Sequence, residues 1–229
     1  MLVELLKVCG KTKDICKGVY LHSHILQRGL LEKNPYIGSN LINMYCRCGM
    51  LTKAQEVLDE LPVQDIVSWN ALITGYIHAG RGHSALHLFR QMQKMGLSPN
   101  EVTFICVLKA CGSIGASDMG SQIHDEIVFQ GMLKMTKKGK TNVLLGNALV
   151  DMYVKCDMLS KAREVLGTLP SRDAISWSVV ISGYAHMGQG QEALECFTLM
   201  QQEGFSPDEV TFTSVLKACG SICDLEKGK

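Results

Sequence analysis

Apolar residues recur along the chain at the three- and four-residue spacing of an amphipathic helix. The stripe that runs from Trp69 to Tyr76 has this spacing, and a second stripe of the same kind begins a few residues after Gly80. Gly96 then stands where helices commonly end in a left-handed residue. The pattern predicts a hairpin of two helices over residues 66–95.

The same pattern returns over residues 174–203, with Trp177 in the place of Trp69. We expect both tryptophans to be largely buried. The positions expected in the core of the second helices are Leu88, Phe89 and Phe197. No alternating stretch with turn signals predicts a strand.

A longer repetition sets the architecture. The motif Leu-Lys-x-Cys ends at Cys9, Cys111 and Cys219, and the sequence between the first two cysteines resembles that between the last two. Each of these two copies is too long for one structural unit and divides into three hairpins. One such hairpin cannot bury its apolar stripe alone, whereas stacked hairpins form a continuous core. The sequence therefore predicts an all-α fold, an α-solenoid of helical hairpins.

Two families of short helical repeats fit this description in part. The tetratricopeptide pattern requires Gly where this chain has Ile73 and Ile181, and the unit length here alternates between 31 and 35 residues. The chain instead resembles the pentatricopeptide repeat proteins of the plant organellar class, in which standard, long and short repeats follow one another. The stretches that carry the resemblance are 67–76 (standard), 102–111 (long) and 146–156 (short).

This resemblance divides the chain into seven repeats. They are 1–34 (long, without its first residues), 35–65 (short), 66–100 (standard), 101–142 (long), 143–173 (short), 174–208 (standard) and 209–229 (long, ending in or just before its second helix). The extra length of the long repeat 101–142 is expected in a basic loop at 134–140. Because both end repeats are incomplete, we expect a fragment or a truncated gene product.

The resemblance also implies that first helices line an RNA-binding groove, where the fifth and last residues of a repeat contact one base. These pairs are Ser39 with Asp65, Asn70 with Asn100, Asn147 with Asp173, and Ser178 with Asp208. A last-place carboxylate only accepts hydrogen bonds, which suits uracil or guanine, whereas an amide can donate, which suits cytosine or adenine. By the family's rule, Asn at the fifth place favours pyrimidines and Ser favours purines. Helix capping is the alternative role of these residue types, and both roles stay open.

Two further sets recur at fixed places in the same four repeats. Apolar residues at the second place, which by resemblance would wedge bases apart, are Tyr36, Val67, Leu144 and Ile175. Basic or His residues at the thirteenth place, which could contact phosphate, are Arg47, His78, Lys155 and His186. A solvated helix end would also explain each of the latter, but their recurrence favours phosphate. The long repeats carry Val3, Ile105 and Thr213 at the fifth place, and we interpret them as spacers or protein contacts.

Composition narrows the choice of partners. The formal net charge is +1, so attraction to nucleic acid must come from a local stripe. No apolar run approaches the ~18 residues of a membrane span, and the first residues lack the basic region of a targeting peptide. The ten cysteines recur partly at repeat positions, as buried small side chains would, so we expect a reduced compartment with few or no disulfides.

Metal and catalytic chemistry find little support. His83 and His87 have the spacing of zinc ligands, but their equivalents are Gln191 and Glu195 and no third ligand is evident. The paired motifs of the zinc deaminase domain that ends some family members do not occur together. We expect no metal, no cofactor and no catalysis by this chain.

The resemblance therefore implies sequence-specific binding of single-stranded RNA in a mitochondrion or chloroplast, as a specificity factor for transcript editing or processing. A catalytic protein would act in trans, and neither DNA nor a membrane is an expected partner. With the N-terminus toward the RNA 5′ end, the pairs predict the site G-Y-N-U-G, with cytosine favoured at Y. The alternative is a protein-interaction solenoid that binds a peptide in its groove, although such an array has no reason to keep the polar pairs.

Overall fold

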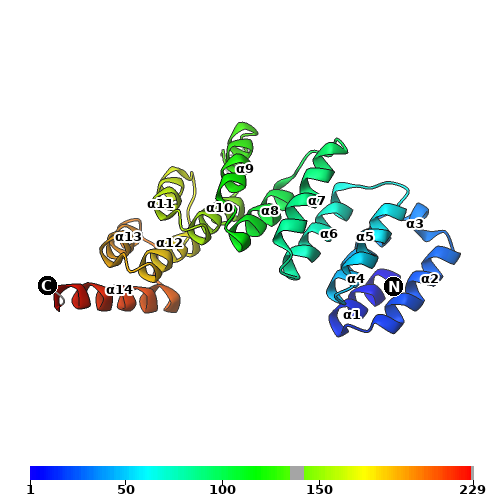
Figure 1. Ribbon diagram of the computed structural model, residues 1–229, viewed down its shortest axis with the longest axis horizontal. Coiled ribbons are helices and arrows are strands. Elements are labelled where there is room, and N and C mark those ends of the chain that lie inside the picture. The colour runs from blue at the N-terminus through cyan, green and yellow to red at the C-terminus, as the bar shows by residue number, and fades with distance from the viewer. Residues whose placement is uncertain (135–141, 228–229) are drawn as a thin grey trace. The chain divides into compact units, whose positions relative to one another are not determined.

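The computed structural model describes residues 1–134 and 142–227, and all regular structure in these ranges is helical (Figure 1). The helices are α1 (Leu2–Thr12), α2 (Ile15–Gln27), α3 (Leu30–Lys33), α4 (Pro35–Arg47), α5 (Leu51–Glu60), α6 (Ile66–His78), α7 (Gly82–Lys94), α8 (Glu101–Ile114), α9 (Ser117–Phe129), α10 (Val143–Lys155), α11 (Leu159–Thr168), α12 (Ala174–His186), α13 (Gly190–Gln202) and α14 (Glu209–Lys227). The predicted all-α class is confirmed. The predicted basic loop, beyond Lys134, falls outside the described residues.

The chain forms two compact units, residues 1–110 and 111–229, and α8 spans the division. In the first unit α4 packs against both α1 and α6, while α2, α5 and α7 pack on these helices as the second members of hairpins. In the second unit α12 packs against both α10 and α14, with α11 and α13 as the second members. Within each unit, taken by itself, the first helices therefore form a layer.

The two predicted hairpins occur as α6–α7 and α12–α13. Trp69 and Trp177 are each 4% exposed, and Leu88 and Phe89 are buried, as the apolar spacing predicted. The chain reverses at Gly80, which has a φ of 70°, a left-handed conformation that costs other residues more than glycine.

The prediction for Phe197 was wrong. In α7 both Leu88 and Phe89 are buried, whereas at the equivalent places in α13 Cys196 is buried and Phe197 is half-buried. Phe197 turns toward α14 and meets the ring of Phe212 edge to face, with 6.3 Å between ring centroids. Phe212 is itself 53% exposed, so it covers this side of α13 only in part.

Glycines let successive first helices approach closely. A Cβ on Gly75 of α6 would overlap the side chain of Cys46 on α4. A Cβ on Gly183, the equivalent residue of α12, would lie 2.8 Å from a methyl of Val154 on α10. These contacts explain why both first-helix layers carry Gly at this place.

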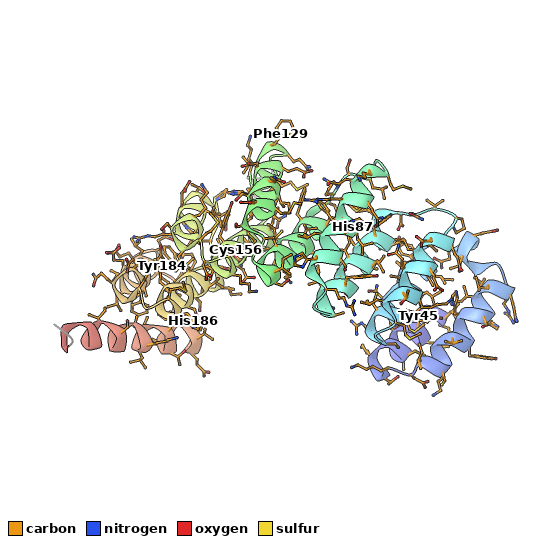
Figure 2. The ribbon with its side chains drawn as sticks, in the orientation of Figure 1. Tyr45, His87, Phe129, Cys156, Tyr184 and His186 are labelled. Atoms are coloured by element: carbon orange, nitrogen blue, oxygen red, sulfur yellow. The ribbon has the colours of Figure 1, made fainter. Side chains whose placement is uncertain are left out.

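A His–Tyr pair, buried in unit 1 and part-buried in unit 2, ties a second helix to the following first helix in each unit. His22 Nδ1 lies 2.9 Å from the hydroxyl of Tyr45, and His124 Nδ1 lies 3.0 Å from that of Tyr153 (Tyr45 is labelled in Figure 2). Burial lowers the pKa of both histidines, because it disfavours their charged forms. The pairs act as neutral polar contacts inside the stacks.

Within the described ranges, no helix has the length and apolar character needed to cross a bilayer.

Candidate nucleic-acid interface

The residue predicted to end each of the repeats 35–65, 66–100, 143–173 and 174–208 caps the helix that follows it. Asp65 and Asp173 are the N-cap residues of α6 and α12, where each carboxylate accepts a hydrogen bond from a backbone N–H three residues on. Asn100 and Asp208 accept in the same way from the backbone N–H groups of Thr103 and Thr211, at 3.0 and 2.8 Å. The capping role considered from the sequence is therefore real, and it fixes these side chains in place.

Three of the four predicted pairs come together. Asn70 Nδ2 donates to Asn100 Oδ1 at 3.2 Å, and Asn147 Nδ2 donates to both carboxylate oxygens of Asp173 at 3.1 and 3.0 Å. In the third pair, the hydroxyl of Ser178 donates to Asp208 Oδ1 over a longer distance of 3.4 Å.

The fourth pair differs. Ser39 is buried and its hydroxyl donates to the backbone carbonyl of Tyr36 at 3.2 Å. No hydrogen bond joins Ser39 to Asp65 among the described residues. The two residues occupy the predicted places in their repeat, but their side chains are not coupled.

The pairs present different hydrogen-bonding groups. Hydrogen bonds from Thr211, and a weaker one from Ser178, hold the pKa of Asp208 below its usual value, so this carboxylate stays ionised and can only accept. At the Asn147–Asp173 pair, Asn147 Oδ1 is buried without a hydrogen-bond partner in the described structure. Such an atom is costly to leave unpaired.

The second-place residues are exposed apolar side chains on successive first helices. Tyr36 and Leu144 are each 68% exposed, Ile175 is 61% and Val67 is 47% exposed. Val102 on α8 and Val210 on α14 occupy the same place and are 53% and 56% exposed. The sequence reasoning did not include these two, although each follows directly on the first residue of its helix and could have been found by alignment of the repeats.

The thirteenth-place residues are exposed at or near the carboxyl ends of the first helices, but their partners differ between units. In unit 1, Arg47 and His78 line one trough of about 360 Å³ together with Lys13, Asn43 and Gly49. Lys13 is a further basic side chain in this trough, and the sequence did not predict its part in the site. This trough contains three basic side chains and no carboxylate.

The equivalent trough in unit 2 has a volume of about 390 Å³ and is lined by Lys155, His186, Asp151 and Asp157. The carboxylates stand at the places that Asn43 and Gly49 occupy in unit 1. Lys155 Nζ forms an ion pair with Asp151 at 2.7 Å. His186, at the carboxyl end of α12 (Figure 2), has Nδ1 3.1 Å from Nζ of Lys217 on α14. Both candidate phosphate contacts of this unit are thus already engaged.

Charge is divided between the units in the same sense. Residues 1–110 contain twelve Lys and Arg against eight Asp and Glu, a net charge of +4. Residues 111–229 contain eleven against fourteen, a net charge of −3. The small net charge of the whole chain therefore hides a basic unit and an acidic one.

Metal ligands do not gather in residues 1–134 and 142–227: no three His, Cys, Asp or Glu side chains lie together there. His83 and His87 are exposed on α7 (His87 is labelled in Figure 2). The letters His124-Asp-Glu match half of the deaminase signature, but His124 is bonded to Tyr153 in the packing between helices.

Two sequence models of a known repeat family match this chain. The model described as the PPR repeat family matches residues 64–113 and 172–221, and the PPR repeat model matches 39–66 and 147–173. Together they run over 39–113 and 147–221, so that each model matches both copies of the longer repetition. The chain belongs to the pentatricopeptide repeat family.

Relatives and solved structures agree with this assignment. This pentatricopeptide repeat chain is 38% identical over 230 residues to a putative pentatricopeptide repeat-containing protein of Arabidopsis thaliana, covering 100% of the chain and 32% of the relative. A relative named chloroplastic, also from Arabidopsis thaliana, is 39% identical over 218 residues, which cover 94% of the chain and 40% of the relative. The chain thus spans about a third of the length of these curated proteins.

The fold is that of the solved pentatricopeptide repeat solenoids. The crystal structure of maize PPR10 superposes with a TM-score of 0.67 at 21% identity, over 99% of the chain and 32% of PPR10. The structure of PPR10 in complex with an 18-nt psaJ RNA element gives 0.69 at 20% identity, over 94% and 31%. The predicted α-solenoid class is confirmed, while the division into long, short and standard repeats stays a prediction.

Proposed function

We propose that this pentatricopeptide repeat chain binds single-stranded RNA sequence-specifically along the first-helix face of each unit. The observation that carries the proposal is one arrangement that recurs on α6, α10 and α12. Each helix presents an exposed apolar residue and, three residues on, a polar side chain bonded to the last residue of the same repeat. An aligned wedge and a fixed polar pair are what reading one base per repeat requires. The RNA complex of PPR10 supports the same use of this fold.

Each pair would read the base edge with the atoms that the helix cap leaves open. At Asp208, capping occupies Oδ1, so Oδ2 would accept from the ring N–H of guanine. At Asn100, capping also occupies Oδ1, so Nδ2 would donate to a ring acceptor. The proposed reading remains G at 35–65, a pyrimidine at 66–100, no preference at 101–142, U at 143–173 and G at 174–208.

Phosphate contacts would come mainly from unit 1. The trough lined by Lys13, Arg47 and His78 contains no carboxylate, whereas its counterpart in unit 2 is neutralised by Asp151 and Asp157. We therefore assign backbone binding chiefly to Arg47 and His78, assisted by Lys13, and a smaller part to Lys155 and His186.

The biological role would be to supply an RNA address for transcript editing or processing in a plastid or mitochondrion. Relatives named chloroplastic support the organellar setting. Catalysis would come from a separate protein or from another domain. A peptide ligand on the same exposed apolar residues is the competing outcome.

The test is fluorescence anisotropy with two labelled RNAs in the same unstructured flanks. One contains GCAUG, and the other replaces the four read bases with bases of opposite hydrogen-bonding sense. We expect weak binding with a preference for GCAUG of about 30-fold or more, since each of the four read bases contributes about 0.5–1.5 kcal/mol per hydrogen bond. Equal affinity for both RNAs would show that the pairs do not read bases.

A further inference from the structure

The hydroxyl of Thr103 joins the two amides of the 66–100 repeat. Thr103 is fully buried at the start of α8, and its Oγ1 lies 2.8 Å from Asn70 Oδ1 and 3.0 Å from Asn100 Oδ1. It also accepts a hydrogen bond of 3.2 Å from the backbone N–H of Asn100. No other hydrogen bond to Asn70 Oδ1 occurs among the described residues.

These contacts determine how both amides are oriented. The backbone N–H of Thr103 can only face an oxygen, so it fixes Asn100 Oδ1 inward at 3.0 Å. Asn70 Nδ2 must then face that oxygen, at 3.2 Å, which leaves Asn70 Oδ1 to accept the single hydroxyl hydrogen of Thr103. Each acceptor atom in the network already accepts at least one hydrogen bond. The hydrogens left over, one on Asn70 and two on Asn100, are all donors.

The equivalent hydroxyls in the other repeats act differently. Ser68 and Thr211 donate to the capping carboxylates of Asp65 and Asp208, both at 2.7 Å. Ser176 donates to Asp173, and Asn147 Oδ1 receives no hydrogen bond from it. A hydroxyl that donates to the fifth residue is thus a specific feature of the Asn70–Asn100 repeat within the described structure.

We propose that Thr103 is a specificity-determining residue that makes this repeat select cytosine over uracil. It acts by positioning, since it holds both amides so that only N–H groups face the base. Cytosine offers ring acceptors to such a surface, whereas uracil places its ring N–H against it. The proposal rests on the RNA-binding function proposed above, and it goes beyond it by giving a buried residue of the following helix control over the base.

The experiment compares Thr103→Val with Thr103→Ser and the wild-type chain. Val has nearly the shape of Thr but no hydroxyl, so Asn70 Oδ1 loses its donor and can turn toward the ring N–H of uracil. We expect the wild type and Thr103→Ser to prefer GCAUG over GUAUG by about tenfold, and Thr103→Val to prefer it by about twofold or less. Thr211→Val, the equivalent change at the 174–208 repeat, should leave the ratio at this base unchanged.

Thermal unfolding and the uracil preference at the fourth base establish that each variant is folded and competent to bind. If Thr103→Val does not fold, Thr103→Ala, which removes the hydroxyl without adding a methyl against the amides, takes its place. A wild-type chain without base preference at any position would overturn the RNA-reading function itself. A wild-type preference for cytosine that Thr103→Val or Thr103→Ala retains in full would overturn only the role of Thr103.

Discussion

The difference between the two basic troughs gives a reciprocal experiment on phosphate binding. Asn43→Asp with Gly49→Asp gives unit 1 the two carboxylates of unit 2, and Asp151→Asn with Asp157→Gly removes them from unit 2. The backbone tolerates the first exchange, because Asp157 already adopts a φ of 58° at the place where Gly49 has 78°. The two double variants therefore change charge in opposite senses at equivalent positions.

The expected size follows from the exposure of these groups. An exposed ion pair contributes about 0.2–1 kcal/mol, so two carboxylates beside Arg47 and His78 should cost about 0.4–2 kcal/mol of binding free energy. The dissociation constant for RNA should then rise about 2- to 30-fold. If one phosphate contact is lost, the log–log salt dependence should become shallower by about 0.7.

The assay is RNA binding by anisotropy between about 20 and 200 mM salt, the range in which phosphate contacts dominate the affinity. The reciprocal variant in unit 2 should bind more tightly and with a steeper salt dependence, because Lys155 is released from Asp151. Circular dichroism melts verify that both variants remain folded. An unchanged affinity and salt slope in the unit 1 variant would refute the assignment of this trough to phosphate.

Three further predictions concern stability. Phe89→Ala should cost about 3–5 kcal/mol in urea unfolding and Phe197→Ala under about 2 kcal/mol, because Phe89 is 2% exposed and Phe197 only half-buried; equal losses would contradict the described packing. Gly75→Ala should lower the free energy of unfolding by about 1–3 kcal/mol, because the added Cβ overlaps Cys46. The control Gly167→Ala, whose added Cβ meets no neighbour, should be neutral or stabilising. An unchanged free energy of unfolding in Gly75→Ala would rule out the close approach of α4 and α6. Burial holds the pKa values of His22 and His124 below 6.5, so the unfolded chain binds more protons than the folded chain below that pH. The free energy of unfolding should therefore fall as pH decreases. Between about pH 7.5 and 5.5 the melting temperature should drop less in the double variant His22→Gln, His124→Gln, which does not titrate in this range.

Local features of the fold could be predicted from the sequence because they depend on helical spacing alone. The hairpins α6–α7 and α12–α13 and the burial of both tryptophans follow from periodicity and glycine breaks. The partial exposure of Phe197 could not be predicted, since it depends on which side of α13 the following helix covers. The His22–Tyr45 contact joins residues 23 apart on different helices, and no local pattern marks it.

The candidate site divides in the same way. The places of the polar pairs and wedges came from repeat alignment, yet the pairing of Asn70 with Asn100 spans 30 residues and depends on tertiary packing. Which atoms of the pair remain open depends further on Thr103, a residue of the next repeat. The difference between Asn43 and the equivalent Asp151 is visible in the sequence. Its effect on the charge beside the thirteenth-place residues follows only from the structure, which places both residues in equivalent troughs.

The central claim is that the last residue of a repeat reads a base with the group that helix capping leaves open, and one reciprocal pair of substitutions tests it. Asn100 with Thr103 and Asp208 with Thr211 form the same cap at equivalent places, differing in amide against carboxylate. In an RNA selection, Asp208→Asn should move the preferred base of the 174–208 repeat from guanine to adenine, and Asn100→Asp should move that of the 66–100 repeat from cytosine to uracil. Each variant should leave the other position unchanged. Enrichment of the same bases by the wild type and both variants would contradict the claim and favour a peptide as the ligand of this face.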